Sequence, residues 1–425
     1  MEFKEKKLLV LGGASLHVKV VEAAKEMGIY TIVTDNVPNA PAKIIADKSY
    51  DINVSDVDEI VSMCMRERVD AIISVCLDFC QIYYQEICER LGLFCWGTKE
   101  QFQILTQKEL FKQACKECGV DIINTYTEQE VINRDCGVEY PVLVKPSQNR
   151  GSRGTSVCNS SEEAEKAIQI AKNLSGDGKA IIEKYMGGKQ DFQVTYLVAD
   201  GNPYVVRTAD RFLGDKKLGM DRVAIALASP SKNTELYFKN VHSHMVKLLN
   251  YLKIENAPVF FQGFIDGDTI RFYDPGMRFP GGEYDRLFSE VMGINLMKSL
   301  IELAFTGHMS HLNEILNEDT AYLNGKVIFT LHSTIKEGVI SYEAPENELT
   351  DIDGVKYVTY RHKIGDEIQM TYDVNQRIAE INILGEDMKD TIRAIHEVQN
   401  ELSVYDENGN SMIFCEFDTK KLRSN

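Results

Sequence analysis

Short apolar runs alternate with amphipathic stretches along the first hundred residues of the chain. Lys7–Gly12 and Tyr30–Thr34 have the length and apolar character of buried strands, and apolar positions recur at helical spacing over His17–Met27 between them. The alternation continues with a helix, a strand and a helix over Val54–Arg68, Ala71–Val75 and Phe79–Leu91. Because alternating strands and helices build parallel sheets, residues 1–105 are predicted to form a parallel α/β domain.

The middle of the chain begins with a helix over Thr106–Gly119 and then changes to strands separated by polar loops. An apolar strand, Tyr140–Pro146, precedes a polar, glycine-rich stretch and a helix over Ser161–Asn173. Further strands are predicted at Ala180–Lys184, Phe192–Val198, Pro203–Thr208, Val259–Ile265 and Thr269–Tyr273. From about Asn324 short β-rich segments alternate with glycine turns, and a helix near Asp387–Leu402 follows. We therefore expect an α+β appendage over residues 311–425.

Composition and charge narrow the class of protein. A chain of 425 residues exceeds what one hydrophobic core usually supports, so two or three domains are expected. The net charge of −17 leaves no basic field for a nucleic acid, and any anionic ligand must be held by a few local cations. The ten cysteines have neither metal-ligand nor disulfide spacing, and no apolar run is long enough to cross a bilayer. These features favour a cytoplasmic protein without nucleic-acid or membrane partners.

The turn after the first predicted strand reads Gly12-Gly13-Ala14-Ser15-Leu16-His17. A dinucleotide-binding turn needs a third glycine, so that the backbone can approach a pyrophosphate at the start of a helix, and this glycine is missing here. Asp35, at the end of the second strand, could bind a ribose, but a nicotinamide-dependent oxidoreductase is disfavoured. A substrate-binding or structural role is expected for this domain.

The strongest chemical signal is Lys145, at the end of an apolar strand and directly before a loop that contains Gly151 and Gly154. One fixed ammonium group followed by flexible backbone N–H donors is what a triphosphate clamp requires. The loop Gln148–Thr155 is predicted to close over a nucleotide as a lid. The alternative is a strand-end lysine beside a mobile surface loop.

About forty residues later, a strand ends in Glu183, Lys184, Tyr185 and Met186, and backbone groups at such a hinge could bind an adenine edge. The order and spacing of Lys145, the glycine loop and this hinge resemble the ATP-grasp superfamily. The resemblance implies ATP and Mg²⁺ as cofactors. It also implies three domains: a Rossmann-like one over 1–105, an ATP-grasp one over 106–310 with a lid at about 130–188, and a C-terminal one over 311–425.

The resemblance extends to the segment in which ATP-grasp proteins place their magnesium ligands. Asp274 keeps a carboxylate and Arg278 keeps a cation, but Gln262 replaces an acid and Gly276 replaces an asparagine. Asp274 and Gln262 are the candidate metal ligands, and a second Mg²⁺ is open to question because Mg²⁺ usually takes one or two carboxylates besides phosphates and water. Four other acids could compensate: Asp266, Asp268, Glu283 and Asp285.

The resemblance also assigns roles to residues outside these motifs. It implies that Lys108 contacts phosphates, that Asp191 lies near the ribose and that Phe272 lines the nucleotide site. Arg278 can hold the transferring phosphoryl group through two parallel hydrogen bonds. On the substrate side the candidates are Arg207, Arg211, Gly281 and Gly282, whereas Lys216 and Lys217 are as readily surface cations.

These residues together predict a carboxylate–amine ligase. A carboxylate would attack the γ-phosphate of ATP, and an amine would then capture the acyl phosphate with release of ADP and phosphate. Bicarbonate activation ranks lower, because the place of the glutamate base of such enzymes is taken by Gly282, although Glu283 is adjacent. A nucleotide-binding protein without turnover is the third reading. The partners expected are a small carboxylate and an amine, and a homodimer is expected from the resemblance alone.

Overall fold

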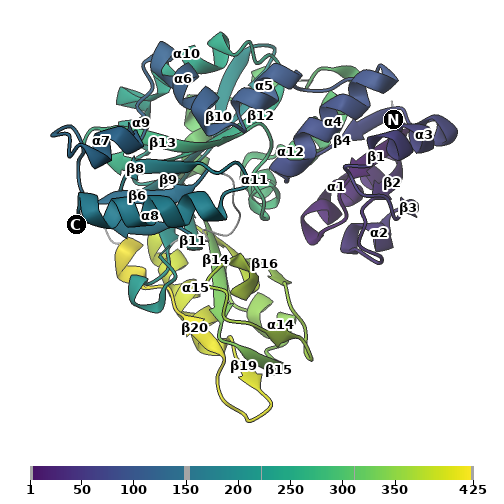
Figure 1. Cartoon of the computed structure of the whole chain (residues 1–425). Coiled ribbons are helices and arrows are strands. Elements are labelled where there is room, and N and C mark those ends of the chain that lie inside the picture. Colours follow the sequence, from purple (N-terminus) through teal and green to yellow (C-terminus); the bar gives the residue numbers. More distant parts are fainter. Residues whose placement is uncertain (1–2, 148–153, 222, 311, 423–425) are drawn as a thin grey trace.

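The computed structural model describes residues 3–147, 154–221, 223–310 and 312–422 (Figure 1). The N-terminal region folds into a parallel sheet with the strand order β3-β2-β1-β4. Its strands are β1 (Lys7–Leu11), β2 (Tyr30–Thr34), β3 (Lys48–Tyr50) and β4 (Ala71–Ile73). The helices are α1 (Ser15–Glu26), α2 (Pro41–Ile45), α3 (Val57–Glu67) and α4 (Asp78–Leu91). The parallel α/β architecture predicted from the alternating pattern is confirmed.

A small antiparallel sheet with the order β5-β8-β6-β7 follows α5 (Lys99–Ile104) and α6 (Lys108–Cys118). Its strands are β5 (Thr125–Tyr126), β6 (Val142–Pro146), β7 (Ser156–Cys158) and β8 (Ala180–Lys184), and its helices are α7 (Glu128–Ile132) and α8 (Ser161–Leu174). Helix α8 buries an alanine-rich face, including Ala164 and Ile168, in a core formed with β6 and β8. This sheet therefore carries its own small core, separate from the main one.

The large sheet has the order β13-β12-β9-β10-β11-β14-β18-β16, with β20 paired to β14. Its strands from the middle of the chain are β9 (Asp191–Ala199), β10 (Asn202–Leu213), β11 (Ala224–Ser229), β12 (Ala257–Asp266) and β13 (Thr269–Gly276). Its strands from the end of the chain are β14 (Val327–Ile335), β16 (Val355–Tyr360), β18 (Arg377–Gly385) and β20 (Ile413–Cys415). The C-terminal strands thus continue the central sheet, with Ala226 opposite Leu331, and the predicted α+β appendage extends from this sheet.

Helices flank this sheet, and a second small sheet extends it at the C-terminal end. The helices are α9 (Thr234–Asn240), α10 (His242–Tyr251), α11 (Tyr284–Met292), α12 (Leu296–Thr306), α13 (Leu312–Ile315), α14 (Glu346–Thr350) and α15 (Met388–Glu401). The small sheet, in the order β17-β15-β19, contains β15 (Gly338–Glu343), β17 (Glu367–Ile368) and β19 (Val404–Asp406). Figure 1 shows the C-terminal strands, in yellow and light green, projecting below the central sheet.

One hydrophobic core joins the N-terminal sheet to the strands β9 and β12 of the large sheet, and a second core fills the C-terminal region. The shared core explains why α1 and α12, far apart in sequence, lie in contact. Among the described residues, no helix is long and apolar enough to cross a membrane.

Candidate functional site

Lys145 ends strand β6 and meets the carboxylate of Glu183 on the neighbouring strand β8. The other carboxylate oxygen of Glu183 accepts a hydrogen bond from the Lys112 ammonium group at 2.6 Å. Glu183 is 3% exposed, so it is a buried acceptor shared by two lysines from different elements. Burial alone would raise the pKa of Glu183, but the nearby charges of Lys145 and Lys112 lower it to about 2.

Lys108 belongs to the same electrostatic cluster. It is the first residue of α6, one helical turn before Lys112, so both ammonium groups lie on one face of that helix. Burial, followed by the positive charge of Lys145, lowers the pKa of Lys108, whereas Asp274 and Glu183 oppose this shift. The fold thus brings three lysines close to one buried carboxylate, that of Glu183. In the sequence these lysines are up to 37 positions apart (145 − 108). Such a group can bind a polyphosphate.

The hinge after β8 is held by backbone hydrogen bonds. The Lys184 amide donates to the Asn124 carbonyl and the Tyr185 amide donates to the Pro141 carbonyl, both at 2.9 Å. The Lys184 side chain pairs with Glu139 at 2.5 Å, and Met186 is buried. A Cβ on Gly187 would lie 2.1 Å from the Tyr185 ring, so this turn requires glycine. An adenine-binding role for the hinge stays a prediction.

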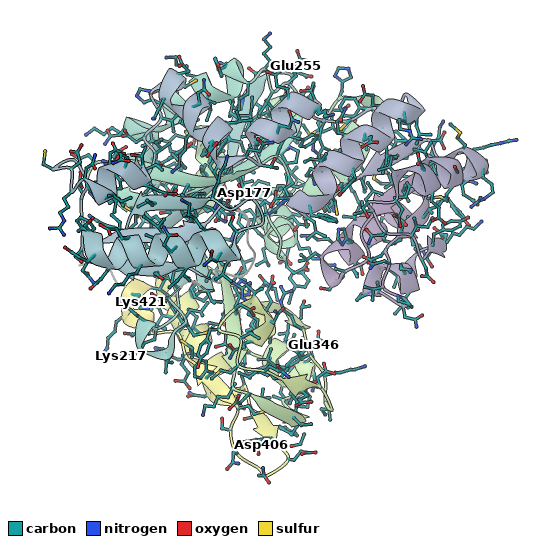
Figure 2. The ribbon with its side chains drawn as sticks, viewed as in Figure 1. Asp177, Lys217, Glu255, Glu346, Asp406 and Lys421 are labelled. Atoms are coloured by element: carbon teal, nitrogen blue, oxygen red, sulfur yellow. The ribbon has the colours of Figure 1, made fainter. Side chains whose placement is uncertain are left out.

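The glycine loop is only partly within the described residues. Gly151 and most of the predicted lid, Gln148–Thr155, lie outside them. Gly154 has a φ of +76°, and a Cβ there would lie 2.8 Å from Leu174, so both the backbone and the packing require glycine. On the other side of the loop, the Ser147 hydroxyl contacts the Asp177 carboxylate, which Figure 2 shows near the middle of the molecule.

Strands β12 and β13 form a hairpin that places the two candidate metal ligands opposite each other, Gln262 paired with Asp274. Burial raises the pKa of Asp274, while the positive charges of Lys108, Arg211 and Arg278 oppose it and Asp78 adds to it. Asp274 therefore lies within electrostatic reach of both the lysine cluster and Arg278. The hairpin brings the predicted carboxylate to the predicted phosphate site.

Arg278 is anchored by a residue that the sequence did not suggest. Its Nε and Nη2 atoms donate to the two carboxylate oxygens of Asp78 at 2.7 and 2.6 Å, and its guanidinium carbon lies 4.7 Å from the Phe260 ring centroid. A Cβ on Gly276 would lie 2.2 Å from that phenyl ring. The stacked Phe260 thus explains why glycine replaces the asparagine expected at position 276.

Asp191 and Arg211 form a buried pair at the start of β9 and near the end of β10. Burial raises the pKa of Asp191 to about 6, against the attraction of Arg211. Arg211 Nη1 also donates to Gln262 Oε1 at 3.1 Å and to the Tyr273 hydroxyl at 2.8 Å. Because these partners occupy the Asp191 carboxylate, its predicted ribose contact stays a prediction. Gln262 donates in turn to Gln193 at 3.2 Å.

The remaining predicted residues fall in two groups. Phe272 is fully buried, and its ring packs edge to face with Phe261, 6.1 Å between centroids. Arg207, Gly281 and Gly282 lie further along the large sheet, near Glu380 on β18, and a Cβ on Gly282 would lie 2.9 Å from Glu380 Oε1. Lys217 is an exposed cation at the edge of the molecule (Figure 2), and the neighbouring Lys216 lies 5.7 Å from the centroid of the Tyr185 ring.

The acids that could have added metal ligands are already paired, with one exception. Asp266 pairs with Lys189 and Arg271, Asp285 with Lys19, and Glu283 with Arg286. For Asp268 the structure gives only a backbone contact. Among the residues that the structure describes, no three His, Cys, Asp or Glu side chains form a metal cluster. The donor set fits one Mg²⁺ held by Asp274 together with phosphate oxygens, and it does not fit a second.

Three residues of the site were missed from the sequence. Lys112 could have been found by its position four residues after Lys108, because residues at that spacing share a helix face. Asp78 is the first residue of α4, far in sequence from Arg278, and Gln193 is a polar residue within a buried strand. For these two the sequence offers no signal, since their roles depend on contacts between distant segments.

Comparison with known proteins finds relatives over the N-terminal and middle parts of the chain. Residues 107–274 match the family described as carbamoyl-phosphate synthase L chain, ATP binding domain, and residues 8–81 match the PylC-like, N-terminal domain family. The formate-dependent phosphoribosylglycinamide formyltransferase of Methanocaldococcus jannaschii is 31% identical over 199 residues, 45% of this chain and 50% of that protein. The 2-oxoglutarate carboxylase small subunit of Hydrogenobacter thermophilus is 28% identical over 212 residues, 44% of each. The chain spans about half the length of the curated relatives it matches.

Solved structures share the whole fold at low identity. The phosphoribosylglycinamide synthetase of Anaerococcus prevotii has a TM-score of 0.76 at 19% identity, and the L-amino acid ligase of Bacillus licheniformis has 0.76 at 14%; both alignments cover 95% of this chain and 100% of the other. The biotin carboxylase domain dimer of the Hydrogenobacter enzyme, with MgADP and bicarbonate bound, has 0.73 at 18%, covering 96% and 91%. The resemblance to the ATP-grasp superfamily seen in the sequence is confirmed by the matched ATP-binding domain and by the shared fold.

Proposed function

We propose that the protein is an ATP-dependent, ADP-forming ligase that joins a carboxylate to an amine through an acyl phosphate. The single observation that carries this proposal is the convergence of Lys108 and Arg278 on Asp274, with Lys145 and Lys112 beside Lys108. Lys112 and Lys145 come from two separate elements and share the buried Glu183, and Lys108 lies within electrostatic reach of both Lys145 and Glu183. A cluster of cations opposite one carboxylate is suited to a nucleotide triphosphate with a magnesium ion.

In the proposed reaction, the lysines hold the phosphates and fix the γ-phosphate for in-line attack by the substrate carboxylate. Arg278, whose guanidinium is oriented by Asp78 and Phe260, stabilises negative charge on the transferring phosphoryl group. The attacking carboxylate oxygen forms the new O–P bond as the bond to ADP breaks. The amine then attacks the acyl carbon, and phosphate leaves.

Asp274 is the residue proposed to hold Mg²⁺, with Gln262 across the hairpin as a neutral oxygen ligand. When bound, Mg²⁺ would supply positive charge that offsets the negative charge of the phosphate groups. The Gln262 oxygen already accepts from Arg211, so its contribution to the metal is weaker than that of a carboxylate. The nucleotide base is proposed to lie against the hinge at Glu183–Met186, and the ribose towards Asp191.

Two other activities are supported less well. Bicarbonate activation is performed by one structural neighbour, but here Gly282, with φ of +101°, stands where the base of such enzymes is expected. A binder without turnover would not need an arginine fixed by two hydrogen bonds beside the phosphate site. We also propose that the protein forms a homodimer, as the neighbouring biotin carboxylase domain does.

The proposal is tested by measuring ADP and phosphate release with MgATP across a panel of amino acids and small carboxylates. We expect release that depends on one carboxylate and that falls by about 100-fold or more in Lys145→Ala and Arg278→Ala. Lys217→Ala, which removes an exposed cation, is the matched control and should be unaffected. Tight nucleotide binding without turnover for any pair of substrates would favour the binder instead.

A further inference from the structure

A second group of buried charges lies along the large sheet beyond the phosphate site. Here, the arginine cluster denotes Arg207 on β10, His332 on β14, Arg377 and Glu380 on β18, and Arg361 just after β16. His332 and Glu380 are directly opposite each other across the β14–β18 ladder. Arg207, His332 and Glu380 are 3%, 7% and 2% exposed, so these groups are almost removed from water.

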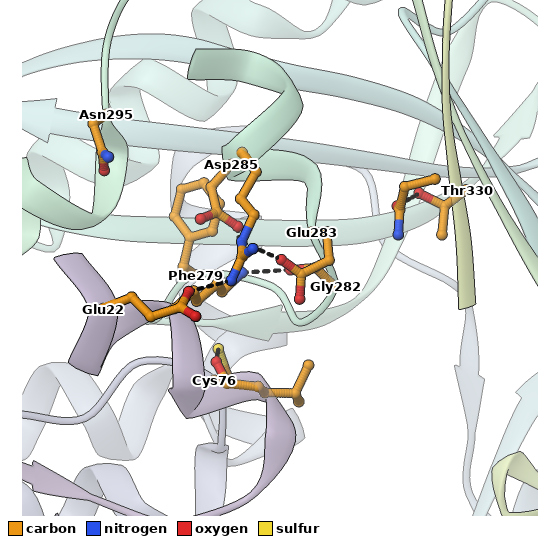
Figure 3. Close-up of polar contacts among 12 residues, drawn as sticks. Glu22, Cys76, Phe279, Gly282, Glu283, Asp285, Asn295 and Thr330 are labelled. Atoms are coloured by element: carbon orange, nitrogen blue, oxygen red, sulfur yellow. Dashed lines mark hydrogen bonds and ion pairs between the residues drawn. The ribbon is translucent and has the colours of Figure 1, made fainter. Parts of the chain in front are cut away.

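The carboxylate of Glu380 already accepts three hydrogen bonds. Its Oε2 atom accepts from Arg361 Nη2 at 2.5 Å, and its Oε1 atom accepts from the Glu283 backbone amide at 3.1 Å and from Asn382 at 3.3 Å. Asn382 is itself fixed by Thr330, whose hydroxyl donates to it at 3.0 Å (Figure 3). The single negative charge of Glu380 is therefore shared among Arg361, Arg207 and Arg377 and cannot balance three guanidinium groups.

Donors in the cluster outnumber their partners. Arg361 Nε, Arg377 Nε and His332 Nδ1 are buried without a hydrogen-bond acceptor among the described residues. Arg377 otherwise donates to the Ala224 carbonyl at 2.6 Å, and Arg207 to the Ser229 hydroxyl at 3.1 Å, both neutral acceptors. Buried polar groups are normally satisfied, and buried charges are normally paired. The cluster lacks acceptors that a bound group could supply.

The charges of the cluster do not balance. Three guanidinium groups and one carboxylate leave a net charge of +2 (3 − 1), because His332 is neutral. Burial, together with the charges of Arg377 and Arg361, keeps the pKa of His332 well below its usual range. Burial also lowers the pKa of Arg207 and of Arg377 to about 10, so both stay protonated at neutral pH.

The nearest acids outside the cluster do not neutralise it. Glu283 pairs with Arg286 at 2.8 Å, and Glu22 approaches the same guanidinium at 2.6 Å (Figure 3). Asp285 pairs with Lys19, whose ammonium group also donates to the Gly282 carbonyl. Each of these acids already has a cation of its own, so the positive charge of the arginine cluster remains.

The distance between the arginine cluster and the phosphate site is comparable to the length of a small substrate molecule. Arg207 and Arg211 lie on one face of β10, four residues apart, which is about 13 Å along a strand. Arg211 contacts Gln262 on the hairpin that carries Asp274. On the outer side, Arg361 is 26% exposed and Gly281 is exposed, which gives the cluster access to solvent.

We propose that the arginine cluster binds an oxyanion of the substrate, a carboxylate or a phosphate monoester that does not itself react. The proposal rests on the proposed function, because it assigns the reacting carboxylate and the amine to the space between the cluster and Arg211. It identifies the substrates as including a molecule with a second anionic group, about 10 Å or more from the reacting atoms. A purely structural ion network would have balanced charges and satisfied donors.

The test uses inorganic phosphate and glutarate as probes, each titrated into the full-length protein at constant ionic strength and followed by thermal unfolding and calorimetry. We expect at least one probe to bind the wild type, and Arg361→Gln and Arg377→Gln to weaken it by about tenfold or more. Arg393→Gln removes an exposed arginine of α15 and should leave binding unchanged. A preference for phosphate indicates a phosphate monoester, and a preference for glutarate indicates a carboxylate.

MgADP binding is measured in the same proteins, so that the two proposals are separated. Loss of probe binding in the arginine variants with unchanged MgADP binding supports the site. Failure of the wild type to bind MgADP would contradict the proposed function. The probe-binding result would then still show whether the arginine cluster binds an anion. The inference is overturned when neither probe binds the wild type, or when Arg361→Gln binds as well as the wild type. If Arg377→Gln does not fold, the test depends on Arg361→Gln. Arg361 is partly exposed, so its replacement should disturb folding less.

Discussion

Glu183 is a buried carboxylate whose two oxygens each face a different lysine. Replacing it with glutamine would leave Lys145 and Lys112 close together in a poorly solvated site without a counter-charge. We expect Glu183→Gln to lower the free energy of unfolding by about 3 kcal/mol, because breaking a buried ion pair leaves an uncompensated charge. The measurement is urea unfolding at pH 7. Glu139→Gln, which breaks the more exposed pair with Lys184, should cost less than about 1 kcal/mol.

The same carboxylate predicts how stability depends on pH. The folded-state pKa of Glu183 is about 2, below the ordinary value of about 4.3. A lowered pKa contributes stability that is present above the unfolded-state pKa and is lost as the pH falls towards the folded-state pKa. The difference in unfolding free energy between wild type and Glu183→Gln should therefore shrink between about pH 5 and pH 2. A difference that stays constant over this range would contradict the assignment.

Asp274 is the only candidate metal ligand of this site that carries a negative charge. In the proposed mechanism, Asp274→Asn keeps the shape of the side chain but removes that charge from beside Lys108 and Arg278. We expect the variant to lose about 100-fold or more in ADP release, and to need more Mg²⁺ for half-maximal activity. The comparison is with Asp268→Asn, on the turn of the same hairpin. Equal activity of both variants would show that Asp274 is not the ligand.

At the scale of elements, the hairpin of β12 and β13 determines what Gln262 can do. Because Gln262 lies opposite Asp274, Gln262→Glu would place a second carboxylate across the hairpin while keeping the oxygen that accepts from Arg211 and Tyr273. We predict that this variant lowers the Mg²⁺ concentration for half-maximal turnover by about tenfold. Gln262→Met, without an oxygen, should raise it. The measurement is ADP release at fixed ATP over a magnesium titration.

The elements themselves were largely predictable from the sequence. The strands at Tyr30–Thr34 and Ala180–Lys184 have the predicted bounds, and the predicted helix over Ser161–Asn173 extends to Leu174. Local periodicity identifies such elements because burial of one face repeats every 3.6 or two residues. β10 is longer than predicted: it continues from Thr208 to Leu213 because its polar residues face buried partners such as Ser231 and Asp191.

The site was predictable only where its residues belong to one continuous motif. Lys145, Glu183, Asp274 and Arg278 follow a familiar order along the chain, and the structure gathers them. Asp78 could not be found in this way, because its contact with Arg278 joins segments 200 residues apart. Gly276 appeared to be a lost ligand in the sequence, and only the packing of Phe260 against it gives the reason for glycine.

At the scale of the whole molecule, the large sheet joins segments that the sequence presents as separate regions. The strand β11 pairs with β14 across the boundary predicted at residue 310, so the C-terminal region shares a sheet with the proposed nucleotide site. Strand pairing between distant segments leaves no local pattern, so the sequence predicted the α+β character of the C-terminal region but not its pairing with the central sheet. The continuity has a functional consequence. It places Arg377 and Glu380 within reach of Arg207 on the central strand β10.

One buried ion pair adds to the shared hydrophobic core that joins the N-terminal region to the rest of the molecule. Lys19 on α1 and Asp285 on α11 are 2% and 4% exposed in their side chains, and Lys19 also donates to the Gly282 carbonyl beside the arginine cluster. Burial alone would lower the pKa of Lys19, but the attraction of Asp285 and Glu283 and the hydrogen bond to Asp285 act together with smaller effects to raise it. A single change at this pair should therefore affect both the docking of the N-terminal region and the loop at Gly281 and Gly282.

We predict that Lys19→Met lowers the unfolding free energy by about 3 kcal/mol, because Asp285 is left buried and unpaired. The double variant Lys19→Met/Asp285→Leu should regain most of this loss, since a well-packed apolar pair can replace a buried ion pair. Lys298→Met breaks an exposed pair with Glu26 between α12 and α1 and should cost less than about 1 kcal/mol.

The single tryptophan gives a direct signal for this prediction. Trp96 is 4% exposed, and its indole N–H donates to the Met277 carbonyl at 3.3 Å. Met277 directly follows β13, the second strand of the hairpin. Its fluorescence during urea unfolding therefore reports on the junction between the N-terminal region and the hairpin. If the pair secures this junction, the fluorescence midpoint of Lys19→Met falls and that of the double variant returns towards the wild type. Equal midpoints in Lys19→Met and Lys298→Met would mean that hydrophobic contacts alone hold the N-terminal region in place.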